Sequence, residues 1–257
     1  MIEKLKTLVW FSRRPRFWAH AIALVTRKVL TDYDAQEIRS SATEWAKGKA
    51  VPLSEALGVL GFEHENDKLQ KIPTEIITEA KTLAKKSKVT MGGAGALDLL
   101  YGVTKLLKPS CIVETGVAYG WSSLAFLSAI NNLPASRLIS VDMPYLKVNN
   151  EPWVGIVVSD RFRKQWTLIK EPDRYGLTRA LKIAGGSIDI CHYDSDKSYW
   201  GRKWAYPKLW GSLKSGGVFI SDDIQDNFAF KEFVEEKGVI FSVIESQGKY
   251  VGIFTKK

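Results

Sequence analysis

The sequence is poor in the side chains that form disulfides and zinc sites. It has two cysteines and three histidines among its 257 residues. Cys111 and Cys191 both fall in apolar runs typical of buried strands, which favours two small core residues over a disulfide. The histidines and cysteines are scattered and show no zinc-ligand spacing. A disulfide-stabilised domain and a zinc-binding domain are therefore not predicted.

The N-terminal region lacks an apolar segment that could cross a membrane. Its uncharged run, residues 17–26, has ten residues, which is too short to span a bilayer. Arg27 and Lys28 follow where a signal peptide would have its cleavage region. The chain also lacks internal repeats and low-complexity linkers. We therefore expect a cytoplasmic protein, or one held at the inner face of a membrane by a peripheral contact.

Acidic residues are scarce in the first thirty positions, which concentrates positive charge there. Residues 1–30 contain seven basic residues and one acidic residue, a net +6 out of the formal +9 of the chain. The nearly balanced remainder argues against a nucleic-acid-binding surface across the whole domain. Trp18, Ile22 and Val25 recur here at helical spacing. Two interpretations remain open: a helix packed on the domain or on a second subunit of a homo-oligomer, and an interfacial helix on anionic lipid.

The remaining chain alternates strand-like and helix-like segments. Residues 1–85 are typical of helices and loops, and we expect this extension to serve as a lid, a dimer contact or a membrane-surface contact. In residues 86–257 the expected strands are 110–116, 137–143, 166–170, 188–194, 216–223, 239–246 and 250–257. The expected helices are 97–109, 121–130, 159–165, 175–184, 199–213 and 229–236, with Pro207 kinking or ending the fifth. This order predicts an α/β fold: a mostly parallel seven-stranded sheet with helices on both faces, a C-terminal antiparallel hairpin and an N-terminal helical extension.

The first expected strand runs into a glycine-containing turn, "VETGVAYGWSS". Gly116 and Gly120 have Gly-x-x-x-Gly spacing, which is neither the dinucleotide fingerprint nor a phosphate-binding loop. Such a turn lets a ligand approach the backbone closely. The second strand ends at Asp142, whose carboxylate is well placed for the two hydroxyls of a ribose. Together the turn and the acid indicate a cofactor site at the carboxyl ends of the strands.

The stretches "IVETGVAYGWSS" and "LISVDM" resemble the first two motifs of class I S-adenosylmethionine-dependent methyltransferases. The resemblance implies a Rossmann-like domain that binds S-adenosylmethionine. It further implies that Glu114 orders the turn and approaches the methionine amino group, that Ser122 starts the next helix, and that Asp142 binds the ribose. Gly116 and Gly120 would leave room for the cofactor.

The third expected strand departs from the pattern of this family, although the resemblance covers roughly residues 88–257. Members often end that strand in Gly-Asp, and the acid contacts the adenine amine. Here the sequence is "IKEPDR", with Pro172 at that place. Glu171 or Asp173 must then make the contact, and Asp173 is our candidate. We also expect Met91, in "VTMGGAG", to lie over the cofactor.

Three carboxylates follow two of the later strands. The apolar run in "ICHYDSDKSYW" ends at Asp194, and "GGVFISDD" ends at Asp222 and Asp223. Parallel strands joined by one helix end side by side, so these side chains should converge beyond the sheet. Converging carboxylates repel one another unless a cation neutralises them. All-oxygen ligand sets suit Mg²⁺, with Mn²⁺ or Ca²⁺ as alternatives, so the three acids are predicted metal ligands.

The same pattern resembles metal-dependent O-methyltransferases. The catechol and caffeoyl-coenzyme A branches carry Asp-x-x-Lys and then Asp-Asn. A branch that acts on sugars of macrolides and other glycosides carries Asp-x-His-x-Tyr and then two acids. The stretches "YDSDKSYWG" and "SDD" resemble the overall residue pattern of the second branch, with lysine in place of its histidine. The resemblance implies metal ligation by Asp194, Asp222 and Asp223, and Lys197 as the base that deprotonates a metal-bound hydroxyl.

Simpler roles remain open for some of these residues. Lys197 can be an ion-pair partner of Asp196. Asp223 can be the N-cap of the next helix. His192, one step inside the strand, fits a core histidine better than a metal ligand.

The expected function is O-methylation of a hydroxylated small molecule. A sugar of a glycoside or of a polysaccharide precursor is the favoured acceptor. Two alternatives remain: a metal-independent methyltransferase of the same fold that acts on nitrogen or a carboxylate, and a non-catalytic membrane-associated subunit. Metal dependence of turnover separates the first two, and tight binding of S-adenosylmethionine excludes the third.

Overall fold

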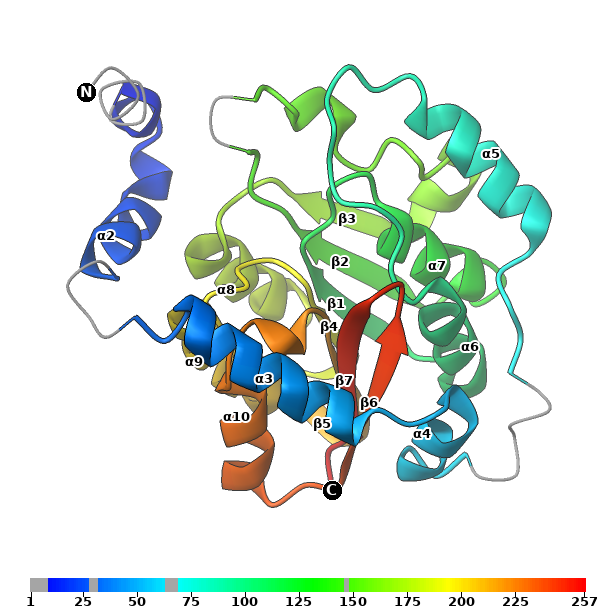
Figure 1. Cartoon of the computed structure of the whole chain (residues 1–257). Coiled ribbons are helices and arrows are strands. Elements are labelled where there is room, and N and C mark those ends of the chain that lie inside the picture. Colours follow the sequence, from blue (N-terminus) through cyan, green and yellow to red (C-terminus); the bar gives the residue numbers. More distant parts are fainter. Residues whose placement is uncertain (1–8, 28–31, 63–68, 146–147) are drawn as a thin grey trace.

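A seven-stranded sheet forms the centre of the molecule (Figure 1). The computed structural model describes residues 9–27, 32–62, 69–145 and 148–257. The strand order is β3-β2-β1-β4-β5-β7-β6. Strands β1 to β5 are parallel, and β7 runs antiparallel between β5 and β6. The chain order reverses between β1 and β4, and the carboxyl ends at such a point are where open α/β sheets bind ligands.

The elements follow one another in regular alternation after the N-terminal helices. The strands are β1 (Cys111–Thr115), β2 (Arg137–Val141), β3 (Trp166–Ile169), β4 (Ile188–Tyr193), β5 (Leu213–Ser221), β6 (Phe241–Ser246) and β7 (Lys249–Thr255). The α-helices are α2 (Trp18–Thr26), α3 (Gln36–Lys49), α4 (Leu53–Val59), α5 (Thr74–Ala84), α6 (Leu97–Leu107), α7 (Trp121–Ile130), α8 (Asp173–Ile183), α9 (Tyr199–Ser212) and α10 (Ala229–Lys237). Short 3₁₀ helices are η1 (Pro15–Phe17), η3 (Glu151–Trp153), η4 (Asp160–Gln165) and η5 (Ile224–Asp226).

Each face of the sheet buries its own apolar layer. One layer joins α6 and α7, together with α4 and α5, to the sheet, and it includes Leu100 and Phe126. The other joins α8, α9 and α10 to the opposite face, and it includes Leu177 and Tyr206. Because both faces are covered, the parallel strands are apolar along nearly their whole length, as the continuous runs in the sequence indicated.

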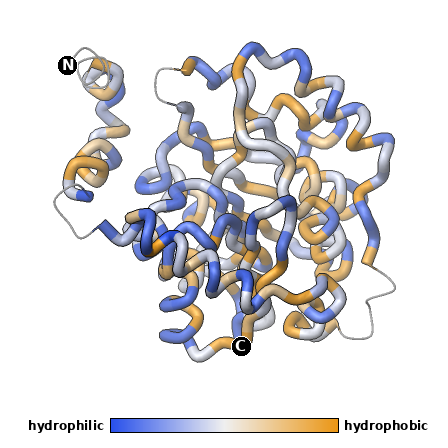
Figure 2. The backbone as a smooth tube through the Cα atoms, in the orientation of Figure 1, coloured by the Kyte–Doolittle hydropathy of each residue, from blue (hydrophilic) through white to orange (hydrophobic). Residues whose placement is uncertain are grey.

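The N-terminal helices lie in different places around this sheet (Figure 1). Helix α3 lies against η5 and the C-terminal hairpin, and Ala50, just after it, pairs with Val243 in an isolated parallel bridge. Its outward residues are hydrophilic (Figure 2), and only Ala42 and Ala46 are buried. Helix α2 lies apart from α3, α4 and α5 in Figure 1. Within the described ranges, no helix combines the length and the apolar character needed to cross a bilayer.

The predicted fold class is confirmed, including the seven strands and the antiparallel hairpin. The division into residues 1–85 and 86–257 stays a prediction. Helix α9 continues through Pro207, so of the two predicted effects of this proline the end of the helix is wrong, and the kink stays a prediction. Tyr206 and Leu209, both fully buried, hold the helix on the sheet on either side of the missing N–H donor.

Two smaller predictions also needed correction. The segment expected as a helix over residues 159–165 is the 3₁₀ helix η4, in which only Phe162 is buried. One apolar contact does not make the stripe that an α-helix needs for packing. Helix α8 begins at Asp173, because Pro172 occupies its N-cap position with extended backbone.

Candidate active site

A cavity of about 460 Å³ opens beyond the carboxyl ends of the central strands. Gly116, Asp142 and Asp194, which follow β1, β2 and β4, line it, and Asp173 at the start of α8 closes one side. This volume falls within the range of about 300–1,000 Å³ that is usual for small-molecule sites. The structure therefore places a ligand-sized crevice where the sequence predicted the cofactor.

The two glycines of the turn allow close backbone packing. Gly116 has φ +83°, and a Cβ there would lie 2.4 Å from the carbonyl oxygen of Asp194. Gly120 has φ +93°, and a Cβ there would lie 2.9 Å from the Cα of Gly155. Gly116 lines the crevice, whereas Gly120 packs against protein. Both glycines thus make room for neighbouring backbone, and the predicted room for a cofactor at Gly116 stays a prediction.

Asp142 divides its carboxylate between the turn and the crevice. Its Oδ1 accepts hydrogen bonds from the backbone N–H groups of Val117 (2.8 Å) and Ala118 (3.1 Å). Its Oδ2 is buried and has no hydrogen-bond partner among the described residues. Burial raises the pKa of Asp142 to about 6. A buried oxygen left without a donor fits the predicted role, because a ribose hydroxyl would supply the missing hydrogen bond.

Asp173, rather than Glu171, reaches the crevice. Ser195 Oγ donates to Asp173 Oδ2 at 2.5 Å, and the Tyr193 hydroxyl lies 3.5 Å from the same oxygen. Burial raises the pKa of Asp173 to about 6. Glu171 instead forms an ion pair with Arg179 at 3.2 Å. The adenine contact of Asp173 stays a prediction, and its position at the wall is compatible with it.

Glu114 points into the protein beneath the crevice and does not line it. It is fully buried, and its Oε2 accepts hydrogen bonds from Ser123 Oγ (2.5 Å) and Ser140 Oγ (2.7 Å). Its Oε1 lies 3.6 Å from Nδ1 of His192. The two serines hold Oε2, while Oε1 has no hydrogen-bond partner among the described residues. The predicted approach to the methionine amino group, directly or through water, stays a prediction.

Met91 is not among the residues that line the crevice, whereas Ser122 starts a helix as expected. Met91 is buried, and its Sδ accepts from Asn150 Nδ2 at 3.4 Å, so the neighbouring Gly92 lines the crevice instead. Ser122 is the second residue of α7, as expected of a helix start. It lines an adjoining cavity of about 160 Å³ rather than the crevice.

Helix α2 forms one side of the crevice, and its contact residues there were not predicted from the sequence. His20, Leu24 and Arg27 line the cavity. Both terminal nitrogens of Arg27 donate to the carboxylate of Asp196, with Nη1 at 3.1 Å from Oδ1. Burial alone would raise the pKa of Asp196, but the bonds from Arg27 hold it below its usual value. The alternative pairing of Lys197 with Asp196 is therefore not found.

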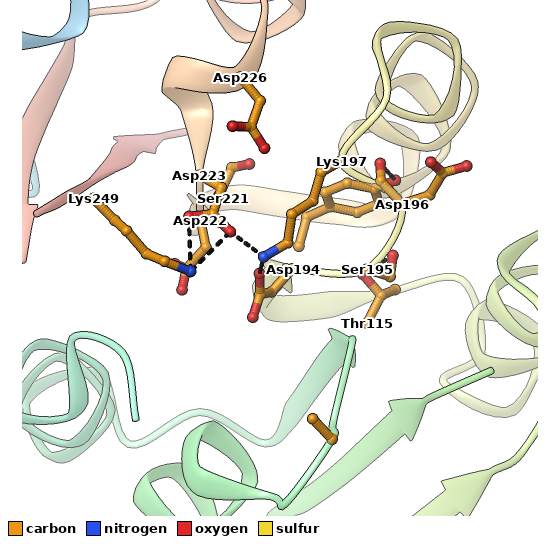
Figure 3. A network of polar contacts seen from close by, with 12 residues as sticks. Thr115, Asp194, Ser195, Asp196, Lys197, Ser221, Asp222, Asp223, Asp226 and Lys249 are labelled. Carbon is orange, nitrogen blue, oxygen red and sulfur yellow. Dashed lines mark hydrogen bonds and ion pairs between the residues drawn. The ribbon is translucent and has the colours of Figure 1, made fainter. Parts of the chain in front are cut away.

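The predicted acidic cluster does form beyond β4 and β5 (Figure 3). Lys197 Nζ lies 3.0 Å from Asp194 Oδ1 and also forms an ion pair with Asp223. Lys249, the first residue of β7, places its Nζ 3.1 Å from Asp223 Oδ1. Asp223 holds the N-cap position of η5, yet its side chain makes no capping hydrogen bond. The sequence missed Lys249 because it arrives from the hairpin, far along the chain.

His192 is a core histidine that lies between two carboxylates. It is fully buried, with Nε2 3.2 Å from Asp222 Oδ1 and Nδ1 3.6 Å from Glu114 Oε1. Burial would lower its pKa, but the two carboxylates, Asp222 foremost, raise it to about 10. This histidine fixes Asp222 from below, so one of its oxygens is already engaged.

The residues present do not fit the predicted metal ion. Lys197 contacts Asp194 and Asp223, Lys249 contacts Asp223, and His192 contacts Asp222. In the part of the chain that the structure describes, no group of three or more His, Cys, Asp or Glu side chains is arranged to hold a metal. Cationic side chains supply the neutralisation that was assigned to a metal ion.

Lys197 is also poorly suited to the predicted role of base. Burial would lower its pKa, but Asp194 and Asp223 raise it above the usual value of lysine. A base has to give up its proton before the reaction, and these two contacts stabilise the protonated form. We therefore correct this assignment.

Comparison with known proteins agrees with the fold. Residues 113–224 match a family described as a methyltransferase domain. No curated protein matches the chain at a significant level. The chain is similar in fold to the O-methyltransferase TomG from Streptomyces achromogenes, which is involved in tomaymycin synthesis and was solved with S-adenosylmethionine. That pair has 13% identity and a TM-score of 0.56, over 80% of this chain and 100% of that one.

Two further solved structures show the same likeness. An O-methyltransferase from Bacillus cereus, in complex with S-adenosylhomocysteine, has 12% identity and a TM-score of 0.56, over 76% of this chain and 96% of that one. The S-adenosylhomocysteine-bound methyltransferase PaMTH1 from Podospora anserina has 13% identity and a TM-score of 0.53, over 80% and 98%. These likenesses show that the chain has the fold of S-adenosylmethionine-dependent methyltransferases, which is the fold that its first two motifs indicated.

Proposed function

We propose that this chain is an O-methyltransferase that acts on a hydroxyl group of a small molecule. The observation that carries the proposal is the place of Asp194. Its side chain lines both the crevice and the adjoining cavity of about 160 Å³. A carboxylate between two cavities can face the cofactor on one side and an acceptor on the other.

The crevice offers complementary groups for the cofactor. Asp142 Oδ2 accepts a hydrogen bond from a ribose hydroxyl, and Asp173 accepts one from the adenine amine. When bound, S-adenosylmethionine supplies a methyl group on a positively charged sulfur, which is transferred to the acceptor oxygen. Gly116 lines both cavities, and its lack of a side chain lets the Asp194 backbone pack against the turn between them.

Asp194 is the group placed to take the proton that the hydroxyl loses. Burial and the neighbouring Asp222 raise its pKa to about 7, which suits a base at neutral pH. Lys197 orients the Asp194 carboxylate through the 3.0 Å contact with Oδ1. The proton moves from the acceptor hydroxyl to a carboxylate oxygen of Asp194 as the oxygen gains the methyl group.

The surrounding space favours a sizeable acceptor. The 160 Å³ cavity shares Gly95, Ser246 and Gln247 with a cavity of about 830 Å³ beside α5 and β6. A hydroxyl can thus sit at Asp194 while the rest of the molecule extends toward the hairpin. This supports the acceptor class suggested by "YDSDKSYWG", a sugar of a glycoside or of a polysaccharide precursor. The predicted divalent metal enters no step of this proposal, because its expected ligands are already paired.

Calorimetric titration with S-adenosylmethionine tests the cofactor site. We expect the wild-type chain to bind, and Asp142→Ala to bind at least about tenfold more weakly, since a hydrogen bond to a charged group contributes about 1.5–3 kcal/mol. Asp160→Ala is the matched control, because that carboxylate is exposed at the surface. A wild-type chain that does not bind would contradict the proposal.

Transfer of a labelled methyl group to a panel of sugars and glycosides tests the reaction. We expect label on a hydroxyl oxygen with the wild-type chain and none with Asp194→Asn. Label on a nitrogen or a carboxylate would contradict O-methylation while leaving the cofactor site intact.

A further inference from the structure

The Asp223 carboxylate contacts two lysines, and it also accepts a hydrogen bond from Gln225 Nε2 at 3.4 Å. Lys197 pairs with one of its oxygens, and Lys249 Nζ lies 3.1 Å from Oδ1 and 3.3 Å from Oδ2 (Figure 3). Asp223 is only 3% exposed, and its backbone has φ +53°, so its carboxylate has little freedom to turn elsewhere. The ammonium groups lie on two sides of one carboxylate.

The hairpin turn fixes Lys249 in this position. Gln247 and Gly248 both have positive φ, +54° and +75°, and Ser246 pairs with Lys249 across them. Positive φ at both central residues is the geometry of a tight two-residue turn that matches the twist of its strands. Lys249 is therefore set by strand register rather than by a long loop.

Lys249 also faces the acceptor side of the site. It lines the 160 Å³ cavity together with Asp194 and Asp222, and its side chain is 59% exposed. An ammonium group has three N–H donors, and Asp223 accounts for two of its contacts. One donor remains for a ligand in that cavity.

We infer that the ammonium groups of Lys197 and Lys249 take the place of a divalent cation in this site, and that Lys249 donates a hydrogen bond to an oxygen of the acceptor. This inference rests on the proposed function, because it assigns the 160 Å³ cavity to the acceptor. The acceptor then carries a second oxygen beside the hydroxyl that is methylated, as vicinal sugar hydroxyls do. Bond formation at the hydroxyl and proton transfer to Asp194 proceed with the charge of Asp223 already balanced.

The contacts of Asp194 Oδ1 and of both Asp223 oxygens explain why the lysines oppose a metal ion here. A divalent ion at this place would have to approach Asp194 and Asp223, and these three oxygens each contact an ammonium group. The two ammonium groups would then lie beside the divalent ion, and the Coulomb repulsion between these positive charges is strong at contact distance. Removing the lysines should free the oxygens and create the metal site.

Thermal unfolding with added Mn²⁺ tests this on the purified full chain after dialysis against a chelator. We expect the wild-type Tm to be the same with Mn²⁺, with Mg²⁺ and with chelator. We expect the double variant Lys197→Met, Lys249→Met to unfold at a lower Tm and to gain about 5–10 °C when Mn²⁺ exceeds its Kd about 100-fold. Lys214→Met is the matched control, because Lys214 pairs with Asp189 at 2.6 Å outside the site.

Two outcomes would overturn the inference. The first is a wild-type Tm that rises with Mn²⁺ and no longer does so in Asp222→Asn. The second is a double variant that remains folded by circular dichroism but gains nothing from Mn²⁺, because the lysines would then not be what keeps the ion out. Titration of the same samples with S-adenosylmethionine separates the two proposals. If the wild-type chain does not bind the cofactor, the proposed function is refuted independently of the effect of Mn²⁺ on Tm.

The contribution of Lys249 to acceptor binding needs its own measurement once a methylated acceptor is in hand. We expect Lys249→Met to raise KM for that acceptor about tenfold or more while S-adenosylmethionine affinity stays within about twofold. An unchanged KM would refute the contact between Lys249 and the acceptor.

Discussion

Replacement of Asp142 by asparagine should separate stability from cofactor binding. Asp142 is 4% exposed, and burial raises its pKa from 3.8 to about 6, so the folded protein without ligand holds an unfavourable negative charge above that pH. In an unfolded chain the group ionises near pH 4. Wild-type stability therefore contains a contribution from protonation of Asp142 that is present at low pH and is lost as the pH rises through about 6.

The size of this effect follows from the two pKa values. Between pH 4.5 and pH 7.5 the wild-type chain should lose about 2 kcal/mol through this group, whereas Asp142→Asn cannot lose it. The variant should thus gain about 2 kcal/mol relative to wild type over that interval, whatever constant cost the new amide brings. Asp173 titrates in the same range, and because the charge of Asp142 raises its pKa, its contribution cancels only in part.

Urea denaturation at both pH values measures the difference, and the slopes must agree between the proteins for the comparison to hold. The same variant should bind S-adenosylmethionine at least about tenfold more weakly, because the ribose would meet an amide N–H₂ in place of a carboxylate oxygen. If the stability difference between the variant and wild type is the same at both pH values, the raised pKa of a buried Asp142 carboxylate is refuted. A variant with undiminished affinity would refute the ribose contact.

Three further outcomes are expected. Asp194→Asn should lower the rate of methyl transfer by about 10²–10⁴-fold, while its affinity for S-adenosylmethionine stays within about threefold of wild type. An equal loss of rate and of cofactor affinity would place Asp194 in cofactor binding alone. Arg27→Ala should raise the Kd for S-adenosylmethionine and speed its dissociation in stopped-flow measurements, because the pairing with Asp196 holds α2 at the crevice, and unchanged rates would refute that role. Trp18 and Ile22, 54% and 64% exposed, should support binding of the chain to vesicles that contain anionic lipid, and Trp18→Ser, Ile22→Ser should abolish it; a wild-type chain that ignores vesicles but dimerises in sedimentation would favour the subunit contact.

The strand ends were predictable from sequence because their logic is local. Apolar runs ending in Asp142, Asp194 and Asp222 mark where buried strands emerge, and parallel topology then brings those ends to one edge of the sheet. The role of Gly116 was equally predictable, because its positive φ and the close approach of neighbouring backbone both require glycine.

Other parts of the site depend on contacts that sequence order does not reveal. Lys249 reaches Asp223 from the last hairpin, and the charge balance of the cluster changes with it. The direction of Glu114 is decided by Ser123, Ser140 and His192, which come from three different elements. The converging carboxylates predict a metal ion from sequence, because Lys249, which helps to neutralise them, lies far along the chain.

The position of α2 has a consequence for regulation. One side of this helix, through His20, Leu24 and Arg27, lines the crevice, while its opposite side leaves Trp18, Ile22 and Val25 at the surface. Whatever binds the outer side also fixes the inner one, so the two events share a coupling free energy. If a lipid or protein that binds the helix increases the affinity for the cofactor by some factor, the cofactor must increase the affinity for that lipid or protein by the same factor.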